Sequence, residues 1–122
     1  MCRFAPARQY HFRCPALSTL AARLAPLLWA RQWVEIMAES ARNPALQQTF
    51  IASDIAMRQG IAEIIAQGIV AGEFRHDINT DGMTIMLFAL VDGLTGRKAI
   101  NKDFSVEPDL PAFRDTLRRL LC

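Results

Sequence analysis

The chain has 122 residues, which suits one domain, and 52% of them are apolar, which excludes a disordered protein. Three cysteines, an odd number, argue against a disulfide-stabilised secreted fold, so we expect a reducing, cytoplasmic setting. The net charge of +2 conceals an asymmetry: residues 1–34 hold five arginines and no acidic residue, whereas residues 35–122 hold nine basic and twelve acidic residues.

Residues 1–14 form a basic head before the first predicted helix. Its arginine-rich, acid-poor composition is typical of a transit peptide, or of a remnant of a nucleic-acid-binding segment. A secretory signal is excluded, because Arg13 and Pro15 interrupt any early apolar core.

Apolar residues recur with a helical period in residues 15–122, and no segment alternates as a half-buried strand would. The sequence therefore predicts an all-α bundle of about five helices in one ligand-binding and dimerisation domain. The first helix starts near Pro15 and is bent or ended by Pro26. The second covers about 28–42 and the third about 44–71, with Gly72 in the left-handed position that follows a helix.

The fourth helix, with Asn79 as its N-cap, holds only one polar residue between Met83 and Val91. A helix that is apolar on all sides must be covered on all sides, so one side requires a partner chain. A last helix, capped by Asp109, completes the bundle. We expect a homodimer through one face of each of these two helices: Met83, Leu87, Leu90 and Leu94, with Phe113, Leu117 and Leu120. The sequence leaves open which face of the fourth helix turns outward. The longest stretch without a charge, between Asp81 and Asp92, has ten residues and predicts no membrane span, which would need about 20.

No pattern indicates catalysis or a cofactor. The sequence has no nucleophile elbow, no HExxH and no glycine-rich phosphate loop. Cys2, His11 and Cys14 match no zinc spacing and lack a fourth ligand, so we predict no metal site and no enzyme.

Bulky aromatic and methionine side chains on three helices fit either an ordinary core or an apolar pocket between helices. The pocket hypothesis places Trp33, Met37, Phe50, Asp54 and Phe88 in its wall, with Asp92 near one end. Asp54 and Arg58 could equally be a solvated helix pair. Asp92, in an apolar setting, could cap a neighbouring helix, pair with Arg97 or Lys98, or contact a ligand. The effector would be small and largely apolar, with one hydrogen-bonding or cationic group.

Four motifs carry a resemblance: WVEIMAESARNP (residues 33–44), AGEFRHD (71–77), LVDGL (90–94) and KDFSVEP (102–108). In this order the chain resembles the C-terminal domain of TetR-family transcriptional regulators, most closely the betaine-repressor-type group. The resemblance implies an all-α repressor domain that dimerises through its last two helices and holds a small-molecule effector in each subunit. A ligand-free dimerisation or interaction module is the alternative.

The segment QYHFR (residues 9–13) resembles the end of that family's recognition helix, where Tyr10 and His11 match positions that approach DNA phosphates. The lysine expected before the next helix is absent, and so are the two helices that support a recognition helix in the major groove. The chain thus resembles an N-terminally truncated regulator. We expect no sequence-specific DNA binding, which would require a complete helix-turn-helix.

Overall fold

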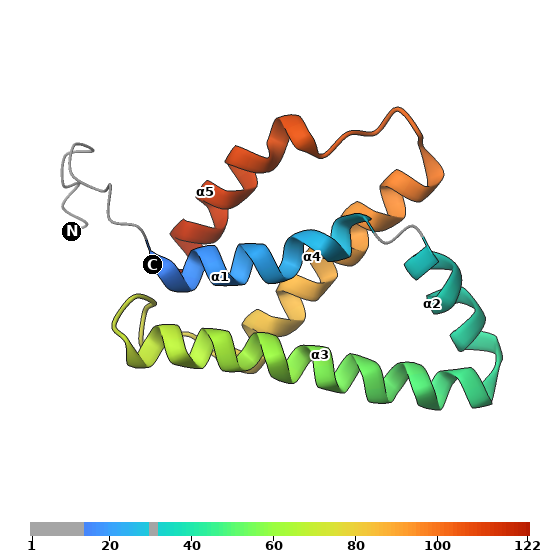
Figure 1. Cartoon of the computed structure of the whole chain (residues 1–122), viewed down its shortest axis with the longest axis horizontal. Coiled ribbons are helices and arrows are strands. Elements are labelled where there is room, and N and C mark those ends of the chain that lie inside the picture. The colour runs from blue at the N-terminus through green and yellow to red at the C-terminus, as the bar shows by residue number, and fades with distance from the viewer. Residues whose placement is uncertain (1–13, 30–31) are drawn as a thin grey trace.

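The computed structural model describes residues 14–29 and 32–122, in which every regular element is a helix (Figure 1). This confirms the predicted all-α class. In chain order the elements are α1 (Pro15–Leu24), the 3-10 helix η1 (Ala25–Trp29), α2 (Gln32–Arg42), α3 (Pro44–Val70), α4 (Thr80–Ile100), the 3-10 helix η2 (Glu107–Asp109) and α5 (Leu110–Leu121).

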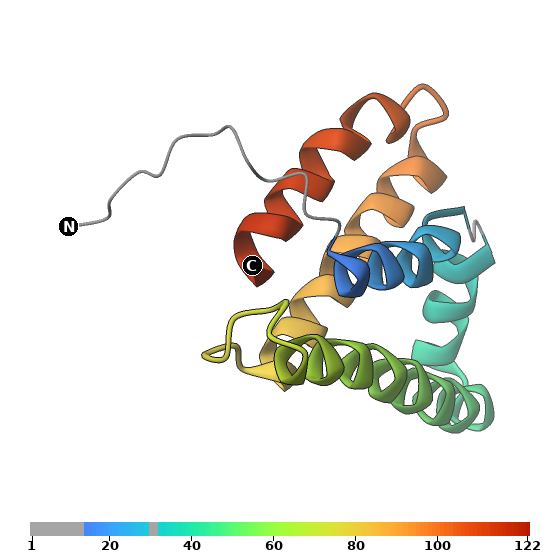
Figure 2. The ribbon, with the colours of Figure 1, turned by 60° about the vertical axis from the view of Figure 1, so that its left-hand side comes forward.

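The long helix α3 organises the fold, since α1, α2 and α4 all pack against it (Figures 1 and 2). α1 and α4 cover its C-terminal half, and α2 folds back along its N-terminal half. The C-terminal end of α5 lies beside the start of α1, and the two helices diverge from there (Figures 1 and 2).

Most predicted boundaries match the structure. The side chain of Asn43 accepts hydrogen bonds from the backbone N–H groups of Ala45 and Leu46 at the start of α3. Asn79 does the same for Gly82 in α4. Gly72 has the positive φ of 74° that the end of α3 requires.

One predicted boundary and one predicted capping interaction differ from the structure. The second helix does not begin at residue 28, because residues 25–29 form η1 and α2 starts at Gln32. The hydroxyl of Thr95 and the ammonium of Lys98, both on α4, contact the carbonyl of Leu27 and the ring of Trp29, and so stabilise η1. Asp109 occupies the N-cap position of α5, but its side chain makes no capping hydrogen bond.

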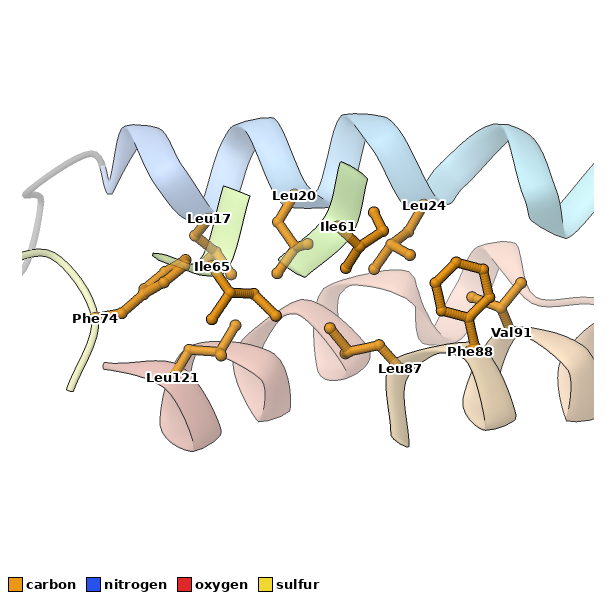
Figure 3. Close-up of a cluster of buried hydrophobic side chains, with 10 residues drawn as sticks. All are labelled: Leu17, Leu20, Leu24, Ile61, Ile65, Phe74, Leu87, Phe88, Val91 and Leu121. Atoms are coloured by element: carbon orange, nitrogen blue, oxygen red, sulfur yellow. The ribbon is translucent and has the colours of Figure 1, made fainter. Parts of the chain in front are cut away.

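The core lies where α1, α3, α4 and the end of α5 meet (Figure 3). Leu20, Ile65 and Leu121 are fully buried there. Burying one such side chain contributes about 1.5–3 kcal/mol, so these residues are the main anchors of α1, α3 and α5. The ten members are Leu17, Leu20, Leu24, Ile61, Ile65, Phe74, Leu87, Phe88, Val91 and Leu121.

The turn after α3 binds both ends of the described chain. The Glu73 carboxylate accepts a hydrogen bond from the backbone N–H of Ala16 at 2.7 Å, in the first turn of α1. Arg75 donates from its backbone N–H to the carbonyl of Leu121 at 2.7 Å, and from its guanidinium to the carbonyl of Leu120 at 2.8 Å. Two oppositely charged residues, two positions apart, therefore satisfy the start of one helix and the end of another.

None of the helices in the described part of the chain combines the length and the apolar character needed to cross a bilayer.

Candidate functional site

An open groove of about 460 Å³ lies between α2 and the first half of α3. Helix α2 supplies one wall and α3 the other, because Asn43-Pro44 reverses the chain between them. The lining is mostly apolar and includes two carboxylates but no lysine or arginine. Its residues are Trp33, Glu35, Ile36, Glu39, Ser40, Leu46, Thr49, Phe50 and Ser53.

Trp33 is the central side chain of this site. Its ring centroid lies 5.0 Å from that of Phe50, with an interplanar angle of 35°. Its indole N–H donates a hydrogen bond of 3.0 Å to the carboxylate of Asp92 on α4. The indole is thus held from both sides and forms a defined wall of the groove.

Two carboxylates stand close to each other behind Trp33. Burial raises the pKa of the Asp92 carboxyl; the hydrogen bond from Trp33 opposes this shift, and the negative charge of Asp54 adds to it. Asp54 accepts a hydrogen bond of 2.8 Å from the guanidinium of Arg58. Repulsion between the carboxylates is therefore offset on the Asp54 side by a cation, and on the Asp92 side only by a neutral N–H donor.

Of the six predicted ligand-binding residues, Trp33 and Phe50 line this groove, and Asp54 and Asp92 lie near Trp33 without lining it. Trp33, Phe50, Asp54 and Asp92 form one connected cluster. Phe88 is only 7% exposed and belongs to the core, where it also borders a separate groove beside α1 (Figure 3). Met37 is 37% exposed and lines none of the described grooves. The six residues therefore do not line one common pocket in the structure.

Sequence reasoning missed the two acidic residues of the groove, Glu35 and Glu39. They are four residues apart on α2, a spacing that places them on one helix face. Leu46 on α3 is 45% exposed and lines the groove, and sequence reasoning did not single it out either.

A second apolar surface lies on α4. Leu87 is 2% exposed and faces the core of its own subunit, so it cannot belong to an outward face, contrary to prediction (Figure 3). Met86 and Leu90 turn outward instead, with 55% and 43% exposure. Nothing lies within 4 Å of a Cβ built on Gly93, so the backbone there is open to close approach.

The remaining predicted interface residues are half-buried within the subunit: Met83 and Leu94 on α4, and Phe113, Leu117 and Leu120 on α5. The fully buried residue of α5 is Leu121, which sequence reasoning did not single out. Met83 and Leu117 pack against the core, so part of this set serves the subunit itself.

The comparison with protein families decides the identity. Residues 16–121 match the family described as BetI-type transcriptional repressor, C-terminal. The chain belongs to this TetR-type family. No curated protein and no solved structure gives a significant match to it.

The described structure is thus that of a BetI-type regulatory domain, from a family of transcriptional regulators rather than a class of enzymes. Its resemblance motif AGEFR has a structural explanation. Gly72 ends α3, Glu73 caps α1, Phe74 fills the core and Arg75 caps α5. The predicted DNA-backbone residues Tyr10 and His11 lie outside the residues that the structure describes, and outside the matched range.

Proposed function

We propose that this BetI-type domain senses a small effector in the α2–α3 groove and holds two regulator subunits together through α4 and α5. The observation that carries the sensing role is the stack of Trp33 on Phe50, fixed by Asp92, at the wall of an open groove. An aromatic wall held by three helices can report occupancy, because a ligand that shifts the indole also shifts α4. The effector groove and the proposed dimer interface would then be coupled, because both depend on the position of α4.

The groove favours an apolar cation over an anion. Aromatic rings attract cations, and Trp33 and Phe50 both line the groove. Glu35 and Glu39 add negative charge to the lining, and no lysine or arginine there opposes it. Half-buried Asp92 adds a carboxylate next to the tryptophan, whereas the charge of Asp54 is offset by Arg58.

A thermal-shift titration of the purified chain tests the sensing role, with benzyltrimethylammonium as the cationic probe and benzyl alcohol as the neutral control. At 100 times its dissociation constant, a ligand that binds only the folded state stabilises it by about 2.7 kcal/mol. We expect the cation to act on the wild type and not on Trp33→Ala. Met37→Ala, a change on the same helix outside the groove, should keep the response. Equal shifts in the wild type and Trp33→Ala would refute this site.

The dimerisation role rests on the outward face of α4. Met86 and Leu90 belong to the apolar segment 83–91 of α4, yet they are exposed, next to the open backbone at Gly93. A second copy of this chain, crossing the same face, would cover them. Dimer interfaces typically bury about 800 Å² per partner, so the proposed interface includes α5 as well as this face of α4.

The alternative function is a dimerisation module that binds no ligand. The exposed face of α4 supports a dimerisation module and a dimeric sensor equally. A dimer that shows no stabilisation with any apolar cation or neutral lipophile would favour this alternative.

A further inference from the structure

Two cysteines from opposite ends of the described chain meet beside the Glu73 turn. The Sγ atoms of Cys14 and Cys122 lie 4.0 Å apart, although 108 positions separate them in the sequence. Cys14 immediately precedes α1, and Cys122 immediately follows α5. Both are free thiols, one half-buried and one exposed.

The surroundings hold the two thiols together. Cys14 donates from its Sγ to the Glu73 carboxylate at 3.6 Å, and the same oxygen binds the N–H of Ala16. The backbone N–H of Cys122 donates to the carbonyl of Arg118 at 2.8 Å, which continues α5 to the last residue. The two sulfurs therefore face each other because two helix ends are fixed at one turn.

We propose that Cys14 and Cys122 form a reversible redox site, in which a disulfide joins the start of α1 to the end of α5. The sulfurs need to approach by about 2 Å to reach a disulfide bond length of about 2.05 Å. Cys122 lies beyond the last turn of α5, so rotation of its side chain requires no rearrangement of the core. In a reducing compartment, disulfides between such neighbouring thiols are typically transient and sense oxidants.

The oxidant is a peroxide. One thiolate attacks hydrogen peroxide, the O–O bond breaks, and a sulfenic acid and hydroxide form. The other thiolate attacks that sulfur, forms the S–S bond and expels a second hydroxide. The hydroxides take up the two thiol protons as water, so the two cysteines lose two electrons and two protons in total.

Partial burial of its sulfur raises the pKa of the Cys122 thiol to about 11. Cys14 and Glu73 raise this pKa further, and the positive charge of Arg118 partly opposes the shift. Cys122 is therefore mostly protonated near neutral pH and reacts slowly by itself. Its proximity to Cys14 favours the intramolecular bond over bonds between chains, because the effective concentration of a neighbouring thiol is high.

The consequence concerns the mobility of α1. In the reduced chain, α1 is held to α5 by non-covalent contacts and through the Glu73 turn. In the oxidised chain, the two helices can no longer separate at this end. Oxidation would thus restrict any movement of the start of α1 relative to the end of α5, independently of effector binding.

The test uses the purified chain, treated with hydrogen peroxide, alkylated and digested with trypsin. We expect residues 14–23 to be linked to residues 120–122, and the link to disappear with dithiothreitol. Cys2→Ser is the matched control and should keep the link, whereas Cys14→Ser and Cys122→Ser should lose it. Links from Cys2 to either partner, or disulfides only between chains, would overturn the proposal.

A second measurement uses Cys2→Ser alone. Closing a loop of this length should raise the Tm of the oxidised form by about 10 °C over the reduced form. An unchanged or lower Tm after complete oxidation would show that the bond is incompatible with this fold, and would also overturn the proposal.

Discussion

Glu73 caps helix α1 from a turn that is 57 positions away, through a hydrogen bond of 2.7 Å from the backbone N–H of Ala16. The Cys14 side chain, at the N-cap position, makes no such bond to the backbone of α1. The first turn of α1 thus obtains its acceptor from tertiary structure, and the carboxylate also complements the positive end of the helix dipole.

We expect Glu73→Ala to lower the free energy of unfolding by about 1 kcal/mol, the usual effect of losing a helix cap. Glu73→Gln keeps an acceptor oxygen and should lose less. Glu63→Ala, an exposed position on α3, is the control and should change stability by less than about 0.5 kcal/mol. Urea unfolding followed by circular dichroism measures all three; equal losses for Glu63→Ala and Glu73→Ala would contradict the capping role.

Gly68 lies directly beneath Phe74. A Cβ at position 68 would stand less than 3 Å from three carbons of that ring, and the ring is fixed in the core at 4% exposure. Gly68→Ala should therefore destabilise the protein by about 1–3 kcal/mol through overpacking, despite the better helix propensity of alanine. The matched control is Gly60→Ala on the same helix, where the nearest atom is 3.8 Å away. Thermal denaturation should show Gly60→Ala to be as stable as the wild type or more so; a loss of stability there similar to that of Gly68→Ala would argue against the packing explanation.

Asp92 is expected to reduce stability at neutral pH. The pKa of Asp92 is raised in the folded state, so the unfolded state releases this proton at a lower pH than the folded state does. The free energy of unfolding therefore falls as the pH rises from the ordinary aspartate pKa of about 3.9 through the raised pKa of the folded state. Asp92→Asn keeps an oxygen for the Trp33 N–H and removes the charge. We expect the variant to be more stable at pH 7, by less than about 1 kcal/mol because solvent screens the half-exposed carboxylate.

The difference between Asp92→Asn and the wild type should shrink as the pH falls below the ordinary aspartate pKa of about 3.9, where both side chains are neutral. Asp103→Asn, an exposed loop position, controls for the change in net charge. Denaturant titrations at pH 3.5 and at pH 7 compare the variants. A gain in stability that is the same at both pH values would exclude the titration of Asp92 as its cause. Asp92→Asn should also bind benzyltrimethylammonium less tightly than the wild type does.

Leu90→Glu should separate the proposed dimer. A carboxylate buried in an apolar interface lacks a partner, so the dimer dissociation constant should rise by about 100-fold or more. Ile51→Glu, at a similarly exposed apolar position on α3, should leave the dimer intact. Sedimentation equilibrium gives the masses, and a wild-type chain that is monomeric at micromolar concentration would refute the interface altogether.

Gly93→Ala offers a subtler variant: it should stabilise the subunit while weakening the dimer, because its Cβ meets only solvent in the subunit.

Local signals in the sequence were sufficient to predict most of the helix ends. Gly72 and Asn79 act on backbone groups within a few residues, and each functions as predicted. The start of α2 was misplaced because η1 depends on contacts from Thr95 and Lys98, about 70 positions away.

The candidate site was only partly predictable for a similar reason. Helical spacing correctly put Trp33, Phe50, Asp54 and Asp92 on faces that meet. It could not show that α1 covers only the C-terminal half of α3, which leaves Leu46 in a groove and places Phe88 in the core. Burial of a residue on a long helix depends on which neighbour reaches it, and that is a tertiary property.

The turn that binds α1 and α5 has a further consequence for amide hydrogen exchange. Ala16 and the last carbonyls of α5 find their partners on Glu73 and Arg75, only two positions apart. If that turn opens, both helix ends lose their partners in the same event. Amides in the first turn of α1 and the last turn of α5 should therefore exchange with one common opening free energy, below that of central α3. The two ends of the domain would then behave as one cooperative unit.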